Sequence, residues 1–174
     1  VASWPDSSGN GQTATQATSG NQPTYKTSIR NGQPVVRFTA SGSDYLDLPN
    51  IYSGATQGEA FIVLKPTADP NATNTRTGLW NFGKPTEYPS HYPWVDGYIY
   101  EGFGTTLRKP VGPPPYIDPP KALNQWRLYN VSSASGRYIL RLDSAPFYST
   151  TTNTVYFPST PRIGGALGTT DHVW

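Results

Sequence analysis

The chain has 174 residues, a length that predicts a single domain able to bury about 70% of its unfolded surface. Only 14% of the residues are charged and the formal net charge is +2, so the clustered basic surface typical of nucleic-acid binding is not expected. The absence of cysteine excludes disulfide bonds, thiol catalysis and cysteine-based zinc sites, and no apolar run reaches the roughly 20 residues that span a bilayer.

The first third of the chain predicts a long polar loop followed by short strands. Residues 1–24 are rich in Ser, Thr, Gly, Asn and Gln and indicate a loop. Residues 34–40 alternate between apolar and polar side chains, which predicts a half-buried strand. Residues 45–48 resume an extended run, and residues 60–64 are apolar at every position. That continuous run predicts a central strand covered on both faces.

The rest of the chain repeats this pattern of short strands. Residues 78–83 and 98–100 indicate two further strands. Residues 126–131 and 137–142 flank a Ser- and Gly-containing turn, which predicts a hairpin, and two closing strands are expected at 154–157 and 161–165, where the pattern resumes. No window shows the 3.6-residue period of an amphipathic helix. Many short strands with regular turn signals therefore predict an all-β fold, an antiparallel sandwich or barrel.

Residues 110–120 form a proline-rich loop by composition. Six of these eleven residues are proline, which cannot donate to a β-ladder. We expect a stiff, polyproline-like surface excursion, and a docking segment for another domain is the alternative interpretation.

The most informative segment is residues 90–109. It contains five aromatic residues, two acids and two bases, with glycines where an extended chain has to turn. Aromatic rings beside hydrogen-bonding side chains are suited to holding a sugar, and they also pack large loops or subunits. The candidate carbohydrate contacts are Tyr92, Trp94, Asp96, Tyr98, Tyr100, Glu101 and Arg108. Three interpretations stay open for them: ligand contact, subunit contact, and loop packing. Trp80 and Trp126 flank strand-like runs and are expected in the core.

Calcium is the metal for which the sequence offers candidate ligands. Asp6, Ser8 and Asn10 precede Gly11 with the spacing of the first half of a calcium loop, but Ala17 stands where the bidentate acid is required. A tight turn is the alternative interpretation of that segment. Asp44 and Asp47 are two further weak candidates, and no cofactor is otherwise implied.

Catalysis has little support in the sequence. The paired carboxylates of a glycosidase would need acids at alternate positions of one strand, and no such run occurs. Asp96 and Glu101 are five residues apart, which places them on opposite faces of an unbroken strand, and Glu59 and Glu87 stand alone. The only histidines, His91 and His172, are expected in loops. We therefore expect a protein that is not an enzyme.

Several motifs, in this order, resemble laminin-G-like, concanavalin A-like jelly-roll domains, and cover nearly the whole chain. The opening motifs occupy residues 4–11, 21–25, 31–38 and 44–46, the hairpin motif W…YN…G…L-x-x-D occupies 126–143, and the penultimate strand is at 161–165. Residues 96–109 resemble phage tail and virion-surface members of the group. The resemblance implies a jelly roll, and its pattern includes one strand before the Trp4 segment and an acidic strand after Trp174. We therefore expect either a longer polypeptide, which the lack of methionine also indicates, or a strand supplied by a neighbouring subunit.

Together these observations predict one β-sandwich domain over residues 1–174. With the resemblance, they indicate a non-enzymatic structural, decorating or adhesive module on a virion or bacterial exterior, with carbohydrate binding as a candidate activity. Its expected partners are other structural subunits or a surface glycan, and neither nucleic acid nor a membrane. The alternatives are a lectin-like module of a secreted protein and a glycoside hydrolase-like enzyme. The latter requires Asp96 and Glu101 to face each other across a cleft, about 5–10 Å apart.

Overall fold

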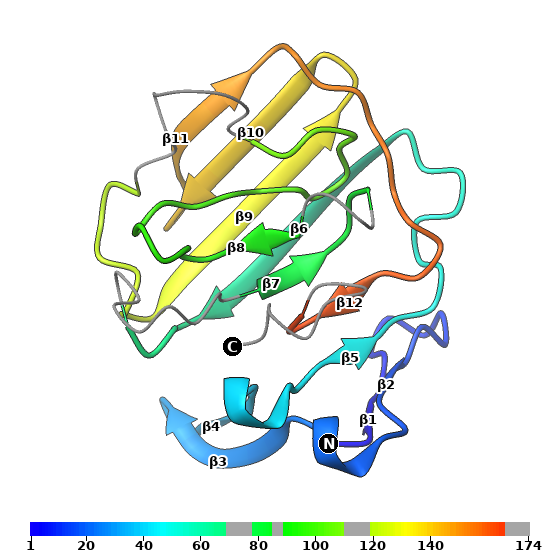
Figure 1. Cartoon of the computed structure of the whole chain (residues 1–174), viewed down its shortest axis with the longest axis vertical. Helices are drawn as coiled ribbons and strands as arrows, with labels where there is room; N and C mark the ends of the chain where they lie inside the picture. The colour runs from blue at the N-terminus through cyan, green and yellow to red at the C-terminus, as the bar shows by residue number, and fades with distance from the viewer. Residues whose placement is uncertain (69–77, 85–88, 110–118, 166–174) are drawn as a thin grey trace.

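The computed structural model describes residues 1–68, 78–84, 89–109 and 119–165 (Figure 1). Within these ranges the chain forms short strands and two 3-10 helices, with no α-helix and no helix long and apolar enough to cross a membrane. The strands are β1 Ser3–Trp4, β2 Ala14–Thr15, β3 Thr24–Arg30, β4 Gln33–Arg37, β5 Leu46–Asp47, β6 Gln57–Leu64, β7 Gly78–Asn81, β8 Ser90–His91, β9 Arg127–Ala134, β10 Arg137–Leu142, β11 Ala145–Thr150 and β12 Arg162–Ile163. The 3-10 helices are η1 Ser19–Asn21 and η2 Ala40–Gly42.

The strands form three sheets in which every named pair is antiparallel. A six-stranded sheet has the order β1-β2-β5-β12-β7-β8, a four-stranded sheet has the order β11-β10-β9-β6, and β3 pairs with β4 in a separate ribbon. This confirms the predicted all-β, antiparallel fold class.

The two larger sheets pack against each other through aromatic side chains. The ring of Trp80 on β7 lies 6.1 Å from that of Tyr129 on β9, and the Tyr138 hydroxyl on β10 donates a 3.1 Å hydrogen bond to the Phe103 carbonyl. In Figure 1, β7 and β8 lie in front of the four-stranded sheet. Trp80 is buried as predicted, whereas Trp126 is only partly buried. The packing is consistent with a β-sandwich.

The predicted hairpin in the second half of the chain is confirmed. Arg137 pairs with Ala134, so the loop consists of Ser135 and Gly136, and Gly136 has a φ of 67°. A two-residue loop of this kind needs a residue that tolerates the left-handed region, and glycine does so without strain. On the inner face Tyr138, Leu140 and Leu142 are buried.

The prediction for residues 60–64 was wrong in one respect. They lie in β6, which is an edge strand of the four-stranded sheet and not a central one. Ala60 and Ile62 pack against the core, but Phe61 is 65% exposed and Val63 is 59% exposed. The continuous apolar run reflects strand propensity, and it does not mean that both faces are covered.

Other segments differ locally from the prediction. Residues 154–157 form no strand, although Phe157 packs into the core with its ring stacked 4.3 Å from that of Tyr52. The strand β11 was not predicted, and of residues 98–100 only Tyr100 makes a β-bridge. The strand expected over 34–40 ends at Arg37. Residues 110–118 of the proline-rich loop lie outside the described residues.

Candidate functional site

The candidate contact residues lie on a hairpin that extends the six-stranded sheet beyond β8. His91 and Tyr100 exchange two backbone hydrogen bonds, of 2.7 and 3.2 Å. At the tip, the Trp94 N–H donates to the Tyr98 carbonyl and the Gly97 N–H donates to the Trp94 carbonyl, at 2.8 and 3.0 Å. Gly97 has a φ of 87°. These contacts define a three-residue hairpin loop that ends in a left-handed glycine, which fixes the tip.

Alternation along the returning strand places its side chains on two faces. Ile99 and Glu101 are fully buried and point inward. Tyr98 and Tyr100 are partly exposed and Asp96 is exposed, on the other face. Asp96 lies in the hairpin loop, so the prediction from odd spacing, which held for an unbroken strand, does not apply to it. Its side chain is exposed whereas that of Glu101 is fully buried, so the two do not face each other as a pair of carboxyl groups.

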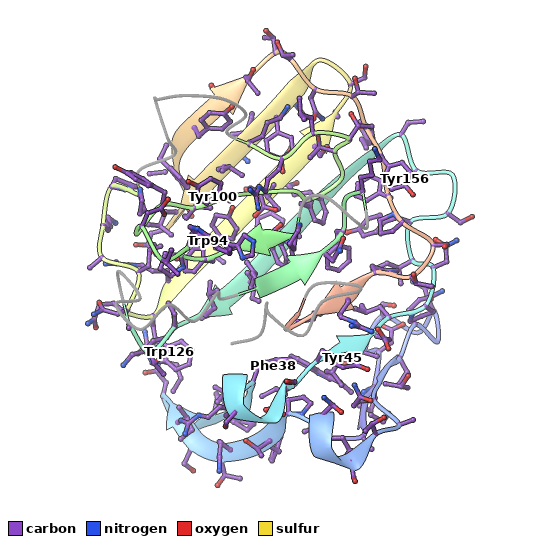
Figure 2. The ribbon with its side chains drawn as sticks, viewed as in Figure 1. Phe38, Tyr45, Trp94, Tyr100, Trp126 and Tyr156 are labelled. Carbon is purple, nitrogen blue, oxygen red and sulfur yellow. The ribbon has the colours of Figure 1, made fainter. Side chains whose placement is uncertain are left out.

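Five of the seven candidate residues form an outer cluster, consisting of Trp94, Asp96, Tyr98, Tyr100 and Arg108. One Asp96 carboxylate oxygen accepts a 2.7 Å hydrogen bond from the Tyr100 hydroxyl, and the other accepts a 3.0 Å bond from the Tyr98 N–H. The Arg108 guanidinium lies 4.8 Å from the centre of the Tyr100 ring, and the Trp94 ring lies 6.2 Å from it. Figure 2 shows Trp94 and Tyr100 side by side on this segment.

The other two candidate residues, Tyr92 and Glu101, are inside the protein. Tyr92 is 1% exposed, and its ring lies 4.9 Å from that of Tyr129. Glu101 has no exposed surface. Neither side chain can touch a ligand from outside in this structure, so the ligand set is corrected to the outer cluster.

The Glu101 carboxylate is surrounded by hydrogen-bond donors. Its Oε1 atom accepts from the Trp80 indole at 3.0 Å, from the Phe103 N–H at 2.8 Å and from the Ser90 hydroxyl, while Oε2 accepts from the Tyr129 hydroxyl at 2.7 Å. Burial raises the pKa of Glu101, and the hydrogen bonds oppose that rise without cancelling it. Burial and the nearby Glu101 also raise the pKa of Tyr129 well above its usual value, so this hydroxyl remains a donor.

Lys109, which the sequence did not single out, is paired with Glu101 in a β-bridge. It is only 6% exposed, and its ammonium donates a 2.8 Å hydrogen bond to the Thr152 carbonyl and lies 5.6 Å from the Tyr138 ring centre. Burial lowers the pKa of Lys109. The segment Glu101–Lys109 is therefore held to β9 through Tyr129 and to the loop after β11 through Thr152.

His91 contacts Trp94 of the outer cluster from the interior of the protein. It is buried, and its ring centre lies 4.1 Å from that of Trp94. This contact covers one side of the indole and leaves part of Trp94 exposed. His172 and Glu87 lie outside the described residues.

The three calcium candidates already have protein partners. Asp6 accepts hydrogen bonds from the Gln12 and Ser8 N–H groups at 3.0 and 2.8 Å, which close its own turn. Asp44 is buried and accepts 2.8 Å bonds from the N–H and hydroxyl of Thr39. Asp47 accepts a 2.8 Å bond from Arg162. In the described part of the chain, no group of three or more potential metal ligands is found.

Comparisons of this chain with models of protein families, with curated proteins and with solved structures gave no match. The outer cluster and the resemblance of the sequence motifs are therefore the two indications of what this chain does.

Proposed function

We propose that this chain is a non-enzymatic adhesive or decorating module that contacts a surface carbohydrate through the outer cluster. The observation that supports this most directly is a partly exposed Trp94 packed against the buried His91 ring, beside an exposed carboxylate and a guanidinium. Flat aromatic faces stack on the apolar faces of sugars, and the neighbouring polar groups bond the hydroxyls.

The charges of the outer cluster favour a neutral sugar. Asp96 and Arg108 carry opposite charges, so the cluster has no net field that selects an ion. Each Asp96 oxygen accepts one hydrogen bond from the protein. A carboxylate has about four lone-pair sites, so two remain for sugar hydroxyls, and Arg108 supplies donors.

The finer fold and the setting follow from the resemblance. We infer a laminin-G-like, concanavalin A-like jelly roll, because the motifs from Trp4 to Gly165 occur in that order. The resemblance of residues 96–109 to phage tail and virion-surface proteins favours a virion or bacterial exterior. A lectin-like module of a secreted protein would use the same surface.

This function can be tested with a glycan array. Any neutral oligosaccharide that the array shows to bind is then titrated by calorimetry. We expect saturable binding that weakens at least about tenfold in Trp94→Ala, because truncation of an aromatic anchor of a binding surface costs about 2 kcal/mol or more. The matched control is Trp4→Ala, since Trp4 is 45% exposed on β1 and lies outside the outer cluster. Absence of binding, or equal loss in both variants, would contradict the proposal. If the hairpin tip were buried only by self-association of the chain, and bound no glycan, a structural role would be favoured instead.

A further inference from the structure

Strand β6 lies at an open edge of the four-stranded sheet. It pairs with β9 over eight residues without a register shift and contains no proline. Within the described ranges no strand pairs with its other edge, so alternate backbone N–H and C=O groups of β6 face outward without a strand partner. Natural proteins normally interrupt or charge such an edge, so an intact edge indicates pairing with another strand.

The other strand edges in the described part of the chain are interrupted or short. The strand β11 contains Pro146 and shifts register against β10. In the separate ribbon, β3 shifts register against β4 and contains Ser28 at a φ of 55°, while β4 contains Pro34. The end strands of the six-stranded sheet, β1 and β8, have two residues each. Of these edges only β6 offers a long regular ladder, so within a second copy of this chain the strand that fits it is another β6.

The side chains of β6 alternate regularly between its two faces. Glu59, Phe61 and Val63 are exposed, and Lys65 continues this alternation directly after the strand. Phe61 is 65% exposed and Val63 is 59% exposed, whereas Ile62 between them packs against the core. In chain order the outer face therefore presents an acid, two apolar side chains and a base.

This order is self-complementary when two copies of the strand run antiparallel about Ile62. Phe61 of each copy then lies opposite Val63 of the other, and Glu59 lies opposite Lys65. Side chains directly opposite each other in an antiparallel pair have Cβ atoms about 4.5–5.5 Å apart, so both apolar residues lose exposed surface. A register centred on Phe61 would instead set Val63 against Glu59.

The charge of Glu59 does not oppose this arrangement. Its Oε1 atom lies 3.6 Å from the Arg141 guanidinium and accepts a 3.1 Å hydrogen bond from Asn130 of the same copy. The carboxylate is therefore balanced within each chain, and the two Glu59 residues of a pair are about 20 Å apart along the strands. The apolar pairs select the register, and the surface ion pair with Lys65 adds little to it.

We propose that two copies of this chain pair through residues 59–65, along the open edge of β6, about a two-fold axis at Ile62. The two four-stranded sheets become one, and the paired stretch ends before Pro66, which lacks an N–H. The contact is isologous, so it closes at a dimer. Because the axis is perpendicular to the joined sheet, the second layer of each copy, with its outer cluster, lies on the same side (Figure 1). That placement suits two contacts with one surface; this consequence rests on the proposed function, whereas the dimer does not.

Sedimentation velocity over a range of concentrations, without glycan, tests for the dimer. Phe61→Lys and Val63→Lys each place a charge in an apolar pair, at an exposed position. The matched control is Ile29→Lys, because Ile29 is 41% exposed on β3, outside the proposed contact. Circular dichroism verifies that each variant is folded. We expect the native chain and the control to form dimers and no larger species, and the two β6 variants to dimerise at least about tenfold more weakly.

Cysteine cross-linking tests the register, since the native chain contains no cysteine. The two Ile62 positions lie opposite each other with Cα atoms about 5 Å apart, within the range that a disulfide spans, whereas the two Gln57 positions are about 34 Å apart. With oxidised glutathione we expect a covalent dimer of Ile62→Cys and none of Gln57→Cys. Three results would overturn the proposal: a native chain that stays monomeric into the millimolar range, equal weakening by Ile29→Lys, or equal cross-linking at the two cysteine positions.

Discussion

The Tyr129 hydroxyl donates a 2.7 Å hydrogen bond to Glu101 Oε2 and so joins the two layers of the protein beneath the outer cluster. Tyr129 lies on β9 of the four-stranded sheet, whereas Glu101 follows the hairpin that extends the other sheet. Trp80 on β7 donates to the same carboxylate. This buried acid therefore helps to fix the position of the hairpin, and with it that of Trp94 and Asp96.

Replacement of Glu101 is expected to destabilise the protein strongly. In Glu101→Ala four buried donors lose their acceptor, and removal of one partner from a buried charged network costs about 3–5 kcal/mol. Glu101→Gln keeps one acceptor oxygen but turns an NH₂ group toward donors, so we expect an intermediate loss of about 1–3 kcal/mol. Urea unfolding measures both free energies.

The control for this prediction is Glu59→Ala. Glu59 is 46% exposed and its oxygen lies 3.6 Å from Arg141, so its ion pair contributes at most about 1 kcal/mol. If Glu101→Ala were no more destabilising than Glu59→Ala, the hydrogen bonds that Glu101 makes between the two layers would not stabilise the protein as described.

The same acid predicts a dependence of stability on pH. Burial raises the pKa of Glu101 above its ordinary value of 4.5, so the folded protein holds this proton more tightly than the unfolded chain does. The group then favours folding below pH 4.5, and this contribution is lost as pH rises through the raised pKa. We expect the unfolding free energy of the native protein minus that of Glu101→Gln to fall as pH rises through this window. An increase would mean that the hydrogen bonds outweigh burial.

For Asp6 the dependence of stability on pH has the opposite sign. Hydrogen bonds from the Gln12 and Ser8 N–H groups and from the Ser8 hydroxyl lower the pKa of Asp6 from 3.8 to about 2. Its contribution to stability is therefore present above pH 3.8 and is lost as pH falls toward about 2. Relative to Asp6→Asn, the native protein should lose stability over that acid range, as measured by thermal melting. An unchanged difference would show that the turn does not hold the carboxylate.

The sequence predicted what depends on local chemistry. The hairpin of β9 and β10 was predicted because apolar alternation flanks a turn that ends in Gly136, and its register has a local cause. The odd spacing of Asp96 and Glu101 did not decide their placement, because Asp96 lies in the hairpin loop and not on an unbroken strand. Ile99 and Glu101 are two residues apart and lie on the same face of the chain. Because Ile99 is apolar, this alternation could have indicated that Glu101 also points inward.

Contacts between distant segments could not be predicted in this way. Tyr129 is 28 residues from Glu101, and no local pattern specifies that pair. The apolar run of β6 indicates a strand but not its neighbours, so its place at an edge depends on the order of the whole sheet. Tyr92 and Trp94 have similar local composition around them, and only tertiary packing makes Tyr92 a core residue.

Gly83 is expected to tolerate no side chain. A Cβ atom there would lie 2.0 Å from the Gly102 carbonyl oxygen and 3.1 Å from that of Thr105, and both contacts are with backbone that cannot rotate away. Gly83→Ala should cost about 1–3 kcal/mol or more and shift the segment that follows Glu101. Gly20→Ala, where nothing lies within 4 Å, should change the unfolding free energy by less than about 0.5 kcal/mol. Equal effects of the two substitutions would contradict this close approach.

The corrected ligand set predicts different consequences for two tyrosines of one hairpin. The Tyr92 side chain is 1% exposed and packs against Tyr129, so Tyr92→Ala leaves a cavity in the core. Loss of a buried aromatic ring costs about 3–5 kcal/mol of unfolding free energy. Tyr98→Ala removes a partly exposed ring, and its N–H bond to Asp96 belongs to the backbone and is kept, so we expect a loss below about 1 kcal/mol. Chemical denaturation measures both, and glycan titration should show the reverse order, with binding weakened in folded Tyr98→Ala. If Tyr98→Ala lowered stability as much as Tyr92→Ala, the outer cluster would be part of the core, and its proposed contact with sugar would lose its basis.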